Sequence, residues 1–290
     1  MMGRSVIVGI VLILGSAGIV VVHRHLDARV QASPQEGEVV WLPSAEALRR
    51  WSFGFEGLLA DLYWLRTVQY YGQRAFRPGA RFEHLEHLLT LVTTLDPQFI
   101  AAYRFGAIFL ALPPPRGAGR PDRALALLDR GIAANPGEWR LLLDKGFVFL
   151  WDLRQYASAA EVFLRVSRHP RAPAWTKDLA AAVYARAGRR EIARRIWQDR
   201  LEHGESEQVR ENARYQLLCL QAEEELERLR ALVRAFRRAR GRWPASWPEM
   251  IAEGLLGQPP RDPMGHLYEL DPRTGAVRLS PQSPLILPRL

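Results

Sequence analysis

The chain has 290 residues, of which 48% are hydrophobic and 24% charged, a composition typical of globular proteins and not of disordered segments. The single cysteine, Cys219, excludes an intrachain disulfide and any paired-cysteine metal or haem motif, and its apolar surroundings favour a core position. The net charge is +9, but acids alternate with the arginines, which favours solvated helix faces and leaves an anionic partner as the alternative.

The chain opens with an uncharged run of apolar or small residues that begins at Ser5 and ends at Val22. A helix of that length spans about 27 Å, close to the hydrocarbon thickness of a bilayer. We therefore expect residues 1–30 to hold a single-pass anchor in an inner (cytoplasmic) membrane. A cleaved signal peptide is the alternative, although the candidate site at 30–32 lies well beyond the run. The short N-terminal flank favours a body on the periplasmic, or extracytoplasmic, side.

Two lead-in helices are predicted within residues 31–62. Ser44 is a helix N-cap, with Glu46 in the first turn. The second helix continues through residues 57–72 and is apolar nearly all round, so we expect it to be buried. Asp61 and Arg66 interrupt it, and in a buried helix they would have to be paired or to act as a cap.

Small residues recur along residues 63–204 at nearly constant intervals. One series is spaced by 34, 40 and 35 residues and a second by 35 and 34, with a bulky residue four positions after each member of the second series. The first series is Gly72, Gly106, Gly146 and Ala181; the second is Ala124, Ala159 and Ala193; the bulky residues are Leu128, Phe163 and Trp197. Prolines at 97, 136 and 170 close the units, and residues 113–119 read as a loop insertion that explains the long interval.

This pattern resembles the tetratricopeptide repeat (TPR), and its best match is residues 122–136. The resemblance implies a mainly α fold, a right-handed α-solenoid of paired antiparallel helices in which the small residues allow close approach. The unit before residue 97 departs most from the family. A non-repeating helical bundle is the alternative.

In such repeats the inner faces of the first helices line a concave groove that takes an extended peptide or a helix. The register of the small residues assigns to this groove Arg66, Gln69, Tyr103, Arg140, Phe147, Trp151, Trp175 and Asp178. Aromatic and arginine side chains are common interface anchors. Core packing of Phe147 and Trp151 is the alternative interpretation.

Residues 205–240 are predicted to form a long helix that caps the last repeat. In the remaining residues, 241–290, Ser246 caps a short helix. One Asp-Pro turn, at 262–265, precedes a β-hairpin over 266–270 and 276–279, and a second, at 271–275, connects its strands. This small α+β module resembles the C-terminal end of type II secretion major pseudopilins through Trp243, Pro244, Asp262, Pro263, Gly265 and Tyr268. The N-terminus lacks the prepilin motif, so a filament subunit is excluded, and the oxygen ligands are too few for a calcium cage.

No sequence pattern indicates catalysis. His84 and His87 have helical metal-ligand spacing but no evident third ligand, and phosphate-binding loops, GxSxG and HExxH motifs are absent from the sequence. We expect no cofactor, no metal and no nucleic-acid partner. The sequence favours a non-catalytic scaffold of the bacterial cell envelope that binds a protein or peptide, for assembly of a pilus, secretion or other membrane complex. A permanent structural subunit of a larger membrane complex is the alternative.

Overall fold

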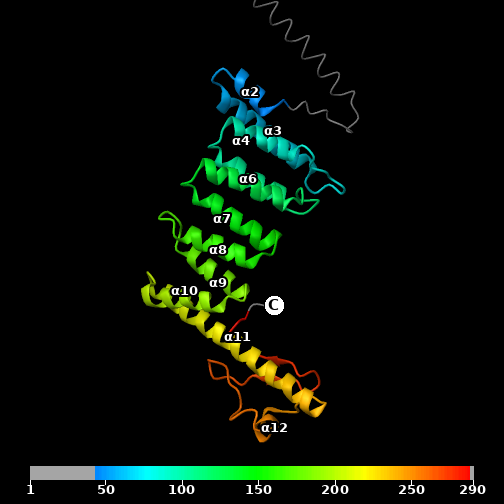
Figure 1. Cartoon of the computed structure of the whole chain (residues 1–290), viewed down its shortest axis with the longest axis vertical. Helices are drawn as coiled ribbons and strands as arrows, with labels where there is room; N and C mark the ends of the chain where they lie inside the picture. Colours follow the sequence, from blue (N-terminus) through cyan, green and yellow to red (C-terminus); the bar gives the residue numbers. More distant parts are fainter. Residues whose placement is uncertain (1–42, 288–290) are drawn as a thin grey trace, which may run out of the picture. The chain divides into compact units, whose positions relative to one another are not determined.

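The computed structural model describes residues 43–287, which form eleven α-helices, one π-helical turn and a two-stranded sheet (Figure 1). The class is therefore mainly α, as predicted. The expected anchor lies outside the described residues, and none of the helices within them is both long enough and apolar enough to cross a membrane.

Most of the helices follow one another as short antiparallel partners (Figure 1). They are α2 (Ala45–Trp51), α3 (Glu56–Arg74), α4 (Leu85–Leu95), α5 (Ile100–Ala111), α6 (Pro121–Ala134), α7 (Trp139–Phe147) with the π-turn η1 (Val148–Asp152), α8 (Tyr156–Ser167), α9 (Trp175–Arg186), α10 (Arg190–His203), α11 (Glu207–Arg240) and α12 (Trp247–Ala252). From α3 to α11, each α-helix packs against the next in the chain. The three closing prolines lie in the connections after α4, α6 and α8, and residues 113–119 form the loop between α5 and α6.

The regularly spaced small residues lie where helices approach closely. Ala124, Ala159, Ala181 and Ala193 are fully buried, and the bulky Leu128, Phe163 and Trp197 are buried too. A Cβ atom on Gly106 would lie 2.6 Å from Leu89, and one on Gly146 would overlap the Phe163 ring. Gly72 is the exception, because it lies on the exposed side of α3 with open space around it.

An ion pair joins α5 to α7 at positions that the repeat register makes equivalent. Arg104 Nε donates to Asp144 Oδ2 at 2.6 Å. The two residues are 40 positions apart, as are Gly106 and Gly146. Burial raises the pKa of Asp144, and the Arg104 guanidinium opposes that rise. The helices α5 and α7 therefore lie side by side at this point.

The expectation that the helix over 57–72 is buried is wrong. α3 buries Ala60, Thr67 and Tyr70 on one side only. Its opposite side exposes several leucines to solvent, and Asp61 and Arg66 lie in solvent as well. Those two charges need no internal partner, because they are not buried.

The C-terminal half of α11 and the last part of the chain share one core. In it, Leu229, Val233 and Phe236 of α11 pack with Trp247 and Met250 of α12 and with Tyr268 and Val277. The strands β1 (Glu269–Leu270) and β2 (Val277–Arg278) are antiparallel, with Leu270 opposite Val277. The predicted hairpin is therefore present but shorter, and the predicted boundary at residue 241 divides a common core. Ser246 occupies the N-cap position of α12 without a side-chain cap hydrogen bond.

Candidate protein-binding site

The predicted groove residues differ widely in accessibility. Arg66 and Gln69 on α3, Arg140 on α7, Trp151 in η1 and Trp175 on α9 are exposed, Phe147 and Asp178 are half-buried, and Tyr103 on α5 is buried. The structure brings only two of them into contact as a pair of rings, Phe147 and Trp151.

Tyr103 belongs to the core and does not line a binding surface. Its side chain is 2% exposed. A Cβ atom on Gly131 of α6 would lie 2.8 Å from the Tyr103 ring, so the absence of a side chain at Gly131 lets α6 close over that ring. Burial raises the pKa of the Tyr103 hydroxyl.

Asp178 and Arg140 are engaged in local ion pairs. The Asp178 carboxylate accepts from Arg200 Nε at 2.6 Å, and Arg200 is buried on α10. Arg140 lies 3.1 Å from Glu138, and its guanidinium stands 4.9 Å from the centroid of the Trp139 ring. Asp178 therefore fixes α9 to α10, whereas Arg140 stays at the surface.

Phe147 and Trp151 are stacked, with ring centroids 4.3 Å apart and planes 10° from parallel. Phe147 also meets the edge of the buried Phe163 ring at 5.2 Å. Trp151 is 67% exposed. The core interpretation thus fits Phe147 in part and does not fit Trp151. Phe147 connects the exposed indole to the packed interior and holds it in place.

Trp151 lies in the π-helical turn η1, which sequence reasoning missed. The Leu153 N–H donates to the Val148 carbonyl at 3.1 Å, the wide spacing of a π-turn. π-Helical segments occur mostly as single turns within α-helices, and these are frequent at functional sites. The run from Phe147 to Trp151 is apolar at every position, so its periodicity carried no signal of the change from α to π.

A second exposed indole, Trp175, begins α9 and is 47% exposed. Tryptophan is enriched among the residues that dominate binding energy at interfaces. We therefore take two separate exposed indoles, Trp151 with its support Phe147 and Trp175, as candidate protein-binding positions, and name them together the indole site.

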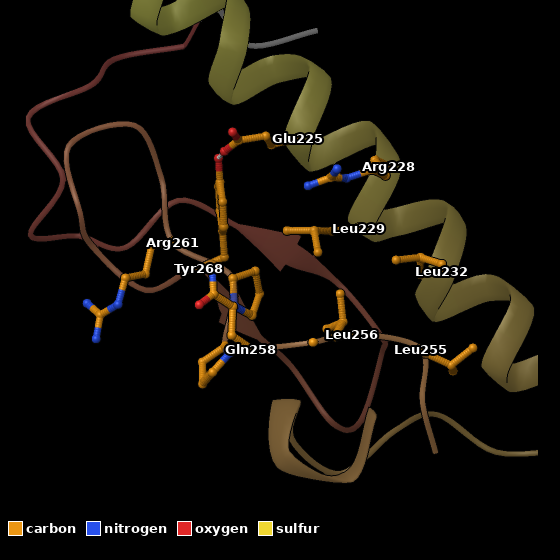
Figure 2. Close-up of a pocket in the computed structure, with 12 residues that line it drawn as sticks. Glu225, Arg228, Leu229, Leu232, Leu255, Leu256, Gln258, Arg261 and Tyr268 are labelled. Atoms are coloured by element: carbon orange, nitrogen blue, oxygen red, sulfur yellow. Dashed lines mark hydrogen bonds between the residues drawn. The ribbon is translucent and has the colours of Figure 1, made fainter. Parts of the chain in front are cut away.

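A separate hollow of about 500 Å³ lies between α11 and the C-terminal residues (Figure 2). The Tyr268 hydroxyl donates to Glu225 at 2.8 Å, and burial, together with this carboxylate, raises the pKa of Tyr268. Arg261 donates to the Gly265 carbonyl at 2.7 Å. Figure 2 shows Arg228 extending from α11 toward Glu225 and Tyr268. The Tyr268–Glu225 bond thus joins α11 to the C-terminal residues, and the Arg261 bond lies within those residues.

The described residues show no metal centre. His84 donates its backbone N–H to the Tyr70 hydroxyl at 3.2 Å, and its ring lies 6.0 Å from the Tyr70 ring. Within residues 43–287 no group of three or more His, Cys, Asp or Glu side chains could hold a metal ion. The Asp262 carboxylate, the position suggestive of a calcium loop, is occupied by hydrogen-bond donors from Ser283, Met264 and His266.

Comparison with known proteins gives no relative: no family model, no curated protein and no solved structure matches the chain.

Proposed function

We propose that the chain is a non-catalytic scaffold of the bacterial cell envelope, anchored by residues 5–22, whose TPR-like α-solenoid binds a partner protein or peptide through the indole site. The single observation that carries the proposal is the exposed Trp151 indole, stacked on a half-buried Phe147 and placed in a π-turn. Because the hydrophobic free energy scales with the apolar area removed from water, a large ordered ring in solvent contributes strongly to binding when a partner covers it.

The energetics favour binding through this residue. Covering the exposed part of a tryptophan side chain contributes roughly 4 kcal/mol before ordering costs are subtracted. Stacking on Phe147 already restricts the indole, so less conformational entropy is lost when a partner docks. Ordered aromatic anchors of this kind are typical of hot spots.

Site-specific photo-cross-linking in the protein's own membranes tests the proposal. Benzoylphenylalanine introduced at Trp151 or Trp175 should yield one discrete cross-linked protein on irradiation. The matched control is the same group at Ile286, which is 80% exposed and lies outside the indole site. Equal cross-linking from all three positions, or none from Trp151 and Trp175, would contradict partner binding at this site.

The exposed leucines of α3 favour a second candidate, a permanent structural subunit whose apolar surface a neighbouring protein always covers. The two candidates differ in the behaviour of the purified full chain. A scaffold in detergent should be monodisperse without its partner, whereas an obligate subunit should aggregate. Light scattering after size-exclusion chromatography separates the two.

A further inference from the structure

The start of the described chain carries an apolar surface that its own helices do not cover. Its side chains, named here the α3 face, are those of Trp51, Phe53, Phe55, Leu58, Leu62 and Leu65, each more than half exposed. The three leucines recur at helical spacing on the side of α3 opposite the buried Ala60 and Thr67. The three aromatic residues lie at the end of α2 and in the turn that leads into α3.

At each end of α3 an exposed phenylalanine has a left-handed backbone conformation, which costs free energy. Phe53 has φ 49° and is 79% exposed, and Phe76 has φ 70° and is 72% exposed. The left-handed region costs a bulky residue about 1–2 kcal/mol. Burial within residues 43–287 does not offset that cost for either ring, although the Phe76 N–H is held by the Pro115 carbonyl at 3.2 Å. Covering the two rings would offset it.

Charge and chain length indicate which surface that is. Arg49 and Arg50 are exposed in the last turn of α2, next to the aromatic turn. Only 20 residues, 23–42, separate the apolar run from Pro43, so Pro43 lies within about 70 Å of the point where an anchored chain would leave the bilayer. Tryptophan, phenylalanine and leucine beside arginine are the side chains of helices that lie in a membrane interface.

We propose that the α3 face binds the surface of an anionic lipid bilayer, with its rings at the boundary between head groups and acyl chains. The inference rests on the membrane anchor in the proposed function and adds a second contact with the same membrane. Symmetric pairing of two copies through the face is less favoured, because it would bring Arg49 and Arg50 of both copies into one apolar interface.

The test places an environment-sensitive NBD fluorophore on the full chain. In a Cys219→Ala background, Phe53→Cys and, separately, Ile286→Cys are labelled and reconstituted in vesicles of phosphatidylcholine and phosphatidylglycerol. We expect the label at position 53 to emit at shorter wavelength and to be quenched by brominated lipid at least two-fold more than the label at position 286. Arg49→Glu with Arg50→Glu should reduce that quenching.

Flotation after alkaline carbonate washing separates the two claims. If the chain does not float, the anchor fails; if it floats but the label at position 53 is no more quenched than the control, the lipid-binding inference alone is overturned. If the emission wavelength is shorter but the label is not quenched, and the mass in detergent is doubled, the face binds a second copy of the chain. That result also overturns the lipid-binding inference. Phe55→Cys, checked for unchanged helicity, repeats the test if Phe53→Cys does not fold.

Discussion

Gly146 and Gly72 hold matched positions in the repeat register but have different surroundings. At Gly146 the Phe163 ring fills the space where a Cβ would stand, and Phe163 is itself fully buried. At Gly72 that space is open. The same residue type therefore serves close packing at one position and has no packing role at the other.

Gly146→Ala should lower the free energy of unfolding by about 1–3 kcal/mol, because a packed ring must move to admit the methyl group. Gly72→Ala should instead raise it by about 0.5–1 kcal/mol, because alanine loses less backbone entropy in a helix. Thermal unfolding of the full chain in detergent, followed by circular dichroism, measures both. Equal effects of the two substitutions would contradict the assigned packing.

Asp262 makes the stability of the C-terminal residues depend on pH. Burial opposes ionisation of its carboxyl, but hydrogen bonds from Ser283 Oγ (2.5 Å) and from the N–H groups of His266 and Met264 (2.9 Å each) lower its pKa below 3.8. A lowered folded-state pKa means that ionised Asp262 stabilises the fold above about pH 4. That contribution is lost as the pH falls through the lowered value.

Asp262→Asn should therefore lower the free energy of unfolding by roughly 1–3 kcal/mol at pH 7. The difference in unfolding free energy between the variant and the parent should shrink below pH 4. Urea unfolding followed by tryptophan fluorescence, repeated between pH 3 and 7, gives both values. The control is Asp271→Asn in the neighbouring turn, where the residue is only partly buried and the loss should be smaller. A pH-independent difference for Asp262→Asn would contradict this role.

At the scale of elements, the sequence predicted what periodicity and turn chemistry can encode. The Ser44 cap, the proline-closed connections, the long helix α11 and the hairpin are all present, because each depends on local residues. The burial of α3 was wrongly predicted, because an apolar composition does not say whether another element lies on each side. The π-turn was missed, because its apolar residues satisfy α and π spacing alike.

α11 joins two cores, and this arrangement predicts how a core substitution acts. Phe236 is 2% exposed and packs with Trp247 and Tyr268. Phe236→Ala should lower the free energy of unfolding of the core around Trp247 and Tyr268 by about 3–5 kcal/mol. Hydrogen exchange should show lost protection over residues 241–287, with protection of α4 to α9 retained. Loss of protection along the whole chain would mean that the two cores unfold as one.

At the scale of the whole molecule, much of the positive charge is structural. Arg190 bonds Glu227 with both terminal nitrogens at 2.7 and 2.8 Å, and Arg194 bonds Glu224 at 2.6 Å, joining α10 to α11. These pairs support the interpretation of most arginines as helix-face residues. The exposed Arg49 and Arg50 differ from them in lying beside exposed aromatic rings.

The proposed N-terminal anchor predicts a definite orientation for the body. With the N-terminus in the cytoplasm, protease added outside spheroplasts should digest residues 43–287, and an alkaline wash should leave the intact chain in the membrane. A cytoplasmic marker protein, resistant under the same conditions, is the control. If the body is digested only after the membrane is dissolved, the body lies on the cytoplasmic side, and the proposed orientation is contradicted.

Partner binding through the indole site is tested most directly by quantitative co-purification. Trp151→Ala with Trp175→Ala should lose at least 90% of the partner recovered from solubilised membranes, while the thermal midpoint stays within a few degrees, because both indoles are exposed. The control variant Ile286→Ala should co-purify with as much partner as the parent chain does. Full recovery with the double variant, at unchanged stability, would contradict binding at this site.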